Sequence, residues 1–267
     1  MEKLFNTLIS SWWGILAICV AALIVWVAFS ALLYRQFFKR FYDIVLSGIA
    51  ILCLSPVLLI LIIVGAVKMK GNPFFTQLRP GKISKKTGKE KIFKLIKFRT
   101  MTNAKDKDGN LLPDDKRLTR YGEILRSTSL DELPELFNIF AGHMTIIGPR
   151  PQLVRDMVFM TEKQRKRHTV SPGLTGLAQC SGRNNMTWEQ KFEYDLEYIK
   201  KITLFGDLKI VFKTAVSVFK REGINEEGMA TAMDLGDYLL HKGEVTEEEY
   251  AKKQAEAKEL LRQVTDK

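Results

Sequence analysis

Two long apolar runs dominate the N-terminal quarter of the chain. The first covers residues 8–33 without a charged side chain, and the second covers residues 44–67. Each is longer than the roughly 20 apolar residues that a membrane-spanning helix needs. The first run therefore predicts a transmembrane helix. A cleaved signal peptide is the alternative, but it would need a shorter apolar region and a small-residue cleavage site, and neither is obvious here.

Basic residues flank the second apolar run on both sides. Arg35, Lys39 and Arg40 precede it, and Lys68, Lys70, Arg79 and Lys82 follow it. Cytoplasmic flanks of membrane helices are enriched in Lys and Arg, so we expect the N-terminus outside and the chain after residue 34 to begin in the cytoplasm. A full crossing by the second run would send one basic cluster outward, which argues against it.

The middle of the second run contains Ser55 and Pro56. Proline removes a helical hydrogen bond and clashes with the preceding turn. A break at this point would let the segment leave the membrane on the side that it entered, with Ser55 and protein contacts satisfying the freed backbone groups. We therefore predict a re-entrant membrane helix that breaks at Ser55 and Pro56. A proline-kinked span is the alternative, because spanning helices tolerate such prolines.

Beyond residue 70 the pattern changes to shorter segments. Residues 73–79 and 91–101 predict two strands of a β-hairpin, joined by a basic loop that contains glycine. Helices are expected at 118–125, 133–142, 153–168 and 188–222, and loops at 103–117 and 171–185. The predicted fold class is therefore α+β and mainly helical, with a small β-hairpin.

The pattern divides the chain into four predicted parts. These are a transmembrane helix with its basic flank (1–38), a re-entrant membrane helix (39–70), a cytoplasmic domain (71–223) and an acidic helical extension (224–267). Near the end of the third part, apolar residues recur at helical spacing: Leu208, Val211, Phe212, Ala215, Val218 and Phe219. Such a helix either lies at a membrane surface or packs on the core, which is the more common arrangement.

Charge is distributed unevenly between these parts. The chain carries a net charge of +11. Residues 224–267 hold eleven acidic and six basic side chains, so their five excess negative charges leave +16 on residues 1–223. A cationic surface of this kind suits anionic lipid headgroups, a phosphorylated substrate or nucleic acid. A solvated cytoplasmic face with the usual excess of basic residues explains part of it as well.

Two adjacent carboxylates, Asp131 and Glu132, occur in the segment SLDELPEL. Pro134 is best tolerated in the first turn of a helix, which fits Asp131 as an N-cap that stabilises the helix by about 1 kcal/mol. The functional alternative follows from the same position, because a helix N-terminus holds a carboxylate ionised and attracts phosphate. An ionised carboxylate can act as a nucleophile. Mg²⁺ bridging both carboxylates to a diphosphate would relieve their mutual repulsion.

Four arginines on constrained backbone are candidates for binding phosphate. They are Arg99 in KFRTM, Arg126 before the two carboxylates, Arg150 between two prolines in GPRP, and Arg183 in SGRN. Arginine recognises phosphate through two parallel hydrogen bonds. In a chain this basic, each arginine alone is a weak signal.

A series of motifs in fixed order adds a resemblance to a known family. The motifs are KRFYDIVLS, LSPVLL, GNPFFTQLRPGK, FKLIKFRTM, LRSTSLDELPELFNI, IIGPRP and SPGLTGLAQCSGRN. Over residues 39–220 the chain resembles the bacterial sugar transferases, the monotopic polyprenyl-phosphate phosphoglycosyl transferases. The resemblance implies transfer of a phosphosugar from a UDP-sugar to undecaprenyl phosphate with release of UMP. It places the catalytic domain on the cytoplasmic face of the bacterial inner membrane.

The same resemblance implies roles for individual residues. Asp131 matches the family's catalytic aspartate, which forms an acyl-phosphosugar intermediate, and Glu132 matches the acidic neighbour that helps to bind Mg²⁺ or manages a proton. The residues that match nucleotide- or phosphate-binding positions are Arg126, Pro149, Arg150, Pro151 and Arg183. Asp207 matches a further acid that is expected to support the site. The Ser55 and Pro56 pair reproduces the break of the family's re-entrant helix.

Two features lie outside the shared core of that family. The helix at 8–33 is an additional span, and the acidic extension is a candidate for homo-oligomerisation or for contact with glycan-assembly partners. A solvated amphipathic helix hairpin is the simpler explanation of the extension. The expected partners are the UDP-sugar, undecaprenyl phosphate and membrane lipids, and no nucleic acid. The competing hypothesis is a non-catalytic, membrane-anchored scaffold that recruits partners through its cationic region.

Overall fold

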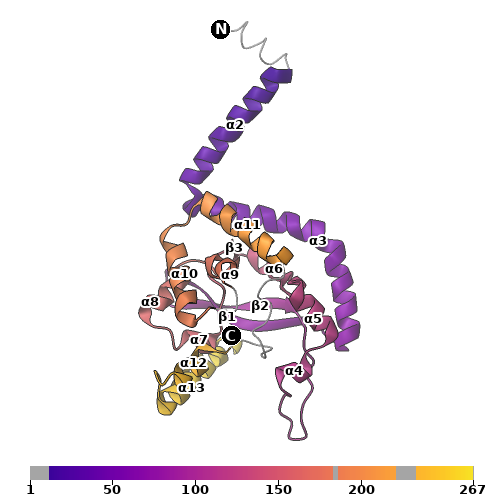
Figure 1. Cartoon of the computed structure of the whole chain (residues 1–267), viewed down its shortest axis with the longest axis vertical. Helices are drawn as coiled ribbons and strands as arrows, with labels where there is room; N and C mark the ends of the chain where they lie inside the picture. Colours follow the sequence, from indigo (N-terminus) through magenta and orange to yellow (C-terminus); the bar gives the residue numbers. More distant parts are fainter. Residues whose placement is uncertain (1–11, 183–185, 221–232, 267) are drawn as a thin grey trace.

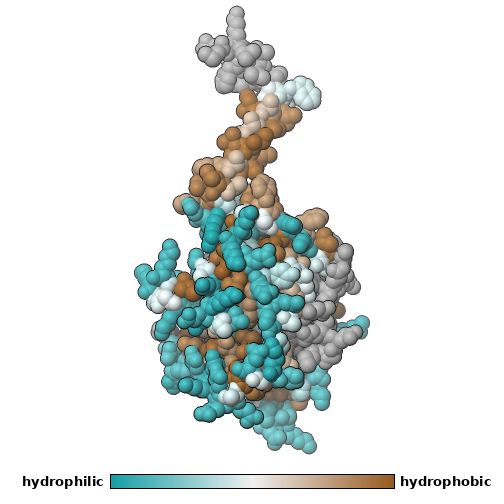
Figure 2. All heavy atoms as spheres, turned by 60° about the vertical axis from the view of Figure 1, so that its left-hand side comes forward, coloured by the Kyte–Doolittle hydropathy of each residue, from teal (hydrophilic) through white to brown (hydrophobic). Residues whose placement is uncertain are grey.

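The computed structural model describes residues 12–182, 186–220 and 233–266. It begins with helix α2 (Trp12–Leu32), which projects away from the rest of the molecule (Figure 1). Apolar side chains cover this helix (Figure 2), because almost every one of its residues is apolar and most of them are exposed. By length and composition, α2 and the helical stretch Tyr34–Met69 could each cross a membrane. The structure therefore places helices where the two apolar runs predict them.

Helix α3 (Lys39–Met69) follows a π-helical turn (Tyr34–Phe38) and is continuous through Pro56. The predicted interruption at Ser55 and Pro56 is therefore wrong as a break in the helix. Figure 1 nevertheless shows α3 changing direction sharply between its two halves. We attribute this bend to Pro56, because a proline inside a helix lacks the N–H and pushes against the preceding turn. The Ser55 hydroxyl donates to the carbonyl of Leu52 at 2.7 Å beside it.

Two small sheets follow the membrane-proximal helices. Strands β1 (Phe74–Ile83) and β2 (Glu90–Phe98) pair antiparallel, which confirms the predicted hairpin, although β2 ends before residue 101. Strands β3 (Thr145–Ile147) and β4 (Gly173–Thr175) form a parallel pair that the sequence did not reveal. Strands of three residues are too short to produce a recognisable alternation. The mainly helical α+β class is confirmed, with a second small sheet added.

The remaining elements are short helices around these sheets. They are α4 (Asp114–Arg117), α5 (Arg120–Ser127), the 3₁₀ turn η2 (Leu130–Glu132), α6 (Glu135–Phe140), α7 (Val154–Met157), α8 (Glu162–Arg165), the 3₁₀ turn η3 (Lys166–Thr169), α9 (Leu177–Ser181), α10 (Trp188–Lys200), α11 (Leu204–Lys220), α12 (Leu235–His241) and α13 (Glu247–Thr265).

Several predicted boundaries are wrong. The expected loop 103–117 contains α4, and the expected loop 171–185 contains β4 and α9. The expected helix 153–168 is divided because Thr161 caps a new helix through a reciprocal pair of hydrogen bonds with Gln164. The expected helix 188–222 is interrupted after Lys200, where Thr203 accepts from the N–H of Gly206 and so begins α11. Side-chain capping thus overrides the longer helical periodicity.

The first half of α3 is attached to the domain by polar side chains. Arg40 donates to the carbonyls of Ile139 and Phe140 at 2.7 and 2.9 Å, at the end of α6. Asp43 accepts from the hydroxyl of Thr145 at 2.6 Å, at the start of β3. Because α6 follows Asp131 and Glu132, and β3 precedes Arg150, these contacts fix both segments relative to the same helix.

Helix α11 presents an apolar face that the domain does not cover. Phe205 and Phe212 are 65% and 71% exposed, whereas Ile210 is buried against the domain. Of the predicted stripe, Leu208, Val211, Phe212 and Ala215 are all exposed, and the side chains of Val218 and Phe219 lie outside the described part. Packing of this stripe on the core is therefore the wrong interpretation. Lys209 and Lys213 are exposed on the same helix.

Helices α12 and α13 pack against the domain rather than extending from it. Leu235 and Ala257 are 2% and 1% exposed, and they share a core cluster with α7 and α10. Asp156 in α7 accepts from the N–H of Leu235 at 2.9 Å. A Cβ on Gly236 would lie 2.6 Å from the ring of Phe159, so glycine permits the close approach at this point. The acidic extension thus shares a hydrophobic core with the domain.

Candidate active site

Asp131 and Glu132 lie in the 3₁₀ turn η2, directly before α6. Ser129 immediately precedes this turn, and its backbone adopts the left-handed conformation with a φ of 56°. Helix α6 begins at Glu135 with Pro134 at its N-cap, so the prediction that Asp131 caps this helix is wrong. The carboxylate of Asp131 is therefore not committed to a helix end. A left-handed, non-glycine residue is a strained conformation of the kind that collects at functional sites.

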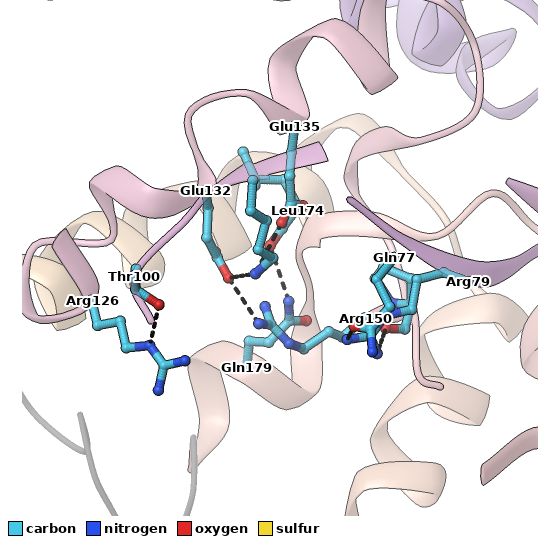
Figure 3. A network of polar contacts seen from close by, with 11 residues as sticks. Gln77, Arg79, Thr100, Arg126, Glu132, Glu135, Arg150, Leu174 and Gln179 are labelled. Atoms are coloured by element: carbon cyan, nitrogen blue, oxygen red, sulfur yellow. Dashed lines mark hydrogen bonds and ion pairs between the residues drawn. The ribbon is translucent and has the colours of Figure 1, made fainter. Parts of the chain in front are cut away.

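Glu132 is held by two cations from distant segments (Figure 3). Its Oε1 atom accepts from the ammonium of Lys97 at 2.7 Å and from the guanidinium of Arg150 at 2.8 Å. Lys97 also lies 3.1 Å from the carboxylate of Glu135. Strand β2, the turn η2, helix α6 and the loop after β3 thus converge at this point.

The two glutamates of this network have opposite protonation behaviour. Burial opposes ionisation of Glu132, but the charges of Arg150 and Lys97 outweigh it and hold the pKa of Glu132 below its usual range. Burial raises the pKa of Glu135 to about 7, and repulsion from Glu132 adds to this although Lys97 opposes it. Glu132 is therefore ionised at neutral pH, whereas Glu135 titrates near it.

Asp131 is half-buried beside this network. Among the residues that the structure describes, none donates a hydrogen bond to its carboxylate. Burial raises the pKa of Asp131, while the positive charges of Lys97, Arg150 and Arg126 lower it. A carboxylate with a raised pKa is a more basic nucleophile, and the surrounding cations suit an anionic electrophile such as a diphosphate.

Arg150 projects from a loop whose backbone is fixed. The carbonyl of Pro149 accepts from the N–H of Gly173 at 2.9 Å, and the carbonyl of Pro151 accepts from Arg79 at 3.0 Å. The side chain of Arg150 is 43% exposed, so it can contact a ligand while Glu132 orients it. Three residues predicted from GPRP are thus brought to the site together.

The other predicted site residues are distributed differently. Arg126 donates from Nε to the hydroxyl of Thr100 at 3.1 Å (Figure 3) and is close enough to lower the pKa of Asp131. Arg99 directly follows β2 and, within the described residues, hydrogen-bonds neither carboxylate of the pair. Arg183 lies outside the described residues.

Asp207 is separate from this network. It is 2% exposed and accepts from Lys39 at 2.6 Å and from the hydroxyl of Tyr34 at 2.7 Å. These partners lie at and just before the start of α3, so Oδ2 of Asp207 attaches α11 to α3. Within the described residues, Asp207 hydrogen-bonds neither Asp131 nor Glu132, so its role as a supporting acid of the site stays a prediction.

Sequence reasoning missed Lys97 and Glu135. A signal for Lys97 was present, because Phe93, Leu95 and Lys97 alternate along β2 and therefore share one face of the strand. Phe93 and Leu95 are buried, so a lysine next in that series is expected to need a buried anionic partner. Glu135 lies three residues after Glu132, but no local pattern distinguishes it from an exposed acid.

Asp131 and Glu132 are the candidate ligands for Mg²⁺ at this site. Among the described residues, no cluster of three or more His, Cys, Asp or Glu side chains has a geometry that could hold a metal ion. Asp131 and Glu132 form an adjacent pair, and Mg²⁺ is often bound by one or two carboxylates together with substrate phosphates. The residues therefore fit Mg²⁺ that arrives with a diphosphate, and do not form a complete protein cage.

Comparison with known proteins relates this chain to one family. The sequence model of the family described as bacterial sugar transferase matches residues 34–221. "Uncharacterized sugar transferase EpsL" of Bacillus subtilis is 43% identical over 194 residues, which cover 73% of this chain and 93% of that protein. "Exopolysaccharide production protein ExoY" of Sinorhizobium fredii is 36% identical over 205 residues, covering 69% and 87%.

A longer relative carries a more specific name. The "UDP-glucose:undecaprenyl-phosphate glucose-1-phosphate transferase" of Klebsiella pneumoniae is 38% identical over 192 residues, which cover 68% of this chain and 40% of that protein. In all three relatives, the similar part covers about seven tenths of this chain. The chain therefore belongs to the bacterial sugar transferase family.

Proposed function

We propose that this protein transfers a phosphosugar from a UDP-sugar to undecaprenyl phosphate and releases UMP. The observation that carries this proposal is the carboxylate of Asp131, which accepts no hydrogen bond from the described residues and lies beside Lys97, Arg150 and Arg126. The name of the Klebsiella relative describes the same class of reaction with glucose 1-phosphate. The proposed product is a polyprenyl-diphosphate-linked sugar, the first membrane intermediate of a surface glycan.

In the first step, an oxygen of Asp131 attacks the β-phosphorus of the UDP-sugar. A new bond forms between this oxygen and phosphorus, and the bond from the β-phosphorus to the bridging oxygen breaks. The electron pair of that bond leaves with UMP, so no proton is consumed. We expect Arg150 and Lys97, whose charges act on Asp131, to stabilise the charge that develops on the phosphoryl oxygens, which is the main task in phosphoryl transfer.

In the second step, a phosphate oxygen of undecaprenyl phosphate attacks the phosphorus of the aspartyl-phosphosugar. The acyl-phosphate bond breaks and returns the carboxylate of Asp131, so the two steps balance without an added reactant. Glu132 keeps Arg150 oriented during both steps through their 2.8 Å ion pair. Mg²⁺ bound by Asp131, Glu132 or both would neutralise charge on the diphosphate.

We further propose how the protein lies in the membrane. Helix α2 spans the bilayer, α3 enters the cytoplasmic leaflet of the bacterial inner membrane and returns at its bend, and α11 lies on the membrane surface. The exposed apolar side chains of α2, α3 and α11 support this arrangement, as does the basic flank from Arg35 to Arg40. The catalytic residues then face the cytoplasm, where nucleotide sugars are available.

The decisive assay measures UMP release by the purified full-length protein. The mixture contains Mg²⁺, undecaprenyl phosphate and one of several UDP-sugars, and Asp131→Asn is compared with the matched variant Asp115→Asn on the exposed helix α4. We expect release with at least one donor, loss of release in Asp131→Asn, and normal release in Asp115→Asn. Full UMP release by Asp131→Asn would refute the nucleophile, whereas no release by the wild-type protein with any donor would favour the scaffold hypothesis.

A second measurement examines the covalent intermediate. The protein is mixed with the active UDP-sugar in the absence of lipid, and its intact mass is recorded. We expect one equivalent of UMP and a mass increase equal to one phosphosugar, which hydroxylamine removes because it cleaves acyl phosphates. UMP release only after lipid is added, with no mass increase, would instead indicate direct transfer between the two substrates.

A further inference from the structure

The backbone at residues 149–151 is held by three other segments of the chain. Each of its three carbonyl oxygens accepts one hydrogen bond from outside the loop, and the pairs are Pro149 with the N–H of Gly173 (2.9 Å), Arg150 with Nη2 of Arg167 (2.7 Å), and Pro151 with Nη1 of Arg79 (3.0 Å). Two of the three residues are prolines, which have no N–H to donate. The loop therefore depends on these outside donors for a fixed conformation.

Arg167 is one of the largest fully buried side chains of the described structure, with 1% of its surface exposed. Its Nε and Nη2 atoms lie 2.8 and 2.6 Å from the same oxygen of Asp195 in α10. Replacing a buried ion pair with apolar residues often leaves stability unchanged, so such a pair is weak evidence for a purely stabilising role. Here the pair also aims Nη2 of Arg167 at the carbonyl of Arg150.

Arg79 holds the next carbonyl without a carboxylate partner. Its Nη2 atom donates to the side-chain carbonyl of Gln77 at 2.7 Å, and within the described chain it forms no ion pair. Burial and the neighbouring charge of Arg150 lower the pKa of Arg79 to about 10. Repulsion between the cations of Arg79 and Arg150 is unfavourable. The same placement allows Arg79 to donate its hydrogen bond to the carbonyl of Pro151.

Arg150 leaves this fixed backbone with its guanidinium on Glu132 and almost half of its side chain exposed. We propose that Arg167, oriented by Asp195, and Arg79 are positioning residues that fix the backbone of Arg150 and so present its guanidinium to the phosphosugar donor. This inference rests on the proposed function, because it concerns the same site. Arg167 is covered by protein and Arg79 is partly buried, and each donates a hydrogen bond to the backbone of the loop.

The test uses full-length protein in which the buried ion pair is replaced by apolar residues of similar size, Arg167→Met with Asp195→Leu. Melting temperature reports the fold, and UMP release at varied UDP-sugar concentration reports KM and kcat. We expect a folded protein whose kcat/KM falls on the order of 10- to 100-fold, mainly through KM, because small displacements of a binding group are costly. The control, Arg165→Met, removes a nearby ion pair with Glu90 that does not contact the loop, while Glu90 keeps its contact with His168, and its KM should stay unchanged.

Arg79→Met provides an independent test, because it removes a donor without leaving a carboxylate unpaired. It should raise KM in the same way. Each change is then repeated in an Arg150→Met protein, where positioning residues should have no further effect because their target is absent.

Two results would overturn the inference: normal KM and kcat in the folded variants, or losses that add fully to that of Arg150→Met. A parent protein that releases no UMP would instead contradict the proposed function itself.

Discussion

Replacing Glu135 with glutamine separates two opposing effects on one buried carboxyl group. Glu135 is 2% exposed and lies 3.1 Å from the ammonium of Lys97. Burial favours the neutral acid, the nearby charge of Glu132 acts in the same direction, and Lys97 favours the ionised form. Glutamine has nearly the same shape as the neutral acid and is uncharged at every pH. Comparison with the variant therefore shows how much ionisation of Glu135 lowers the stability of the folded protein.

The magnitude follows from the pKa in the folded and unfolded chain. The folded protein raises the pKa of Glu135 from 4.5 to about 7, so the folded state binds this proton more tightly than the unfolded state does. The stability linked to this proton is fully present below pH 4.5 and is lost as the pH rises through 7. At about 1.4 kcal/mol for each pH unit, the loss is roughly 3 kcal/mol at pH 8.

The assay compares melting temperatures of the wild type and Glu135→Gln in the same detergent between pH 5 and pH 8. The two proteins should melt within a few degrees at pH 5, and the variant should melt roughly 6–12 °C higher at pH 8, given about 2–4 °C for each kcal/mol in a chain of this size. Glu123→Gln, on the exposed side of α5, serves as the control and should show no such trend. A variant that melts lower than the wild type at pH 8 would refute the reasoning, because it would mean that the ion pair with Lys97 outweighs burial.

Three further changes test other contacts. Lys97→Met removes one of the two cations that hold Glu132, and should lower kcat/KM for UMP release by about 10- to 100-fold, whereas Lys97→Arg should retain more activity. Asp207→Asn weakens the ion pair between α11 and the start of α3, and should lower the unfolding free energy by about 3 kcal/mol without changing kcat per folded molecule. Gly236→Val places an isopropyl group against the ring of Phe159, and should lower the melting temperature through about 1–3 kcal/mol of overpacking. Unchanged kinetics in the first case, or unchanged melting in the others, would contradict these assignments.

Local patterns in the sequence predicted the elements that depend on neighbouring residues. The apolar runs predicted α2 and α3, and alternation predicted the hairpin of β1 and β2, because each signal is complete within a short window. The capping side chains of Thr161 and Thr203 were also present in the sequence. Their effect was underestimated because continuous helical periodicity suggested longer helices, and a cap that divides such a stretch becomes decisive only when the tertiary packing favours the break.

The site depended on information that no short window contains. Family resemblance brought Asp131, Glu132 and Arg150 together as candidates, and the structure places them side by side. The ammonium group that contacts both Glu132 and Glu135 belongs to Lys97, which lies more than thirty residues earlier in the chain. The pairing of β3 with β4 likewise brings together segments nearly thirty residues apart. Contacts of this kind follow from the complete fold, so periodicity and spacing alone could not predict them.

The core shared by α7 and the C-terminal helices has a consequence for the order of folding during synthesis. Leu235 and Ala257 complete the cluster around Val154 and Phe159, yet the ribosome makes them about eighty to one hundred residues later. On the proposed membrane arrangement, α2 and α3 insert while translation continues, but α7 keeps an uncovered apolar surface until residues 233–266 have left the exit tunnel. A nascent chain held in this way is attached to the bilayer before its domain can fold completely, which limits its encounters with other unfinished chains.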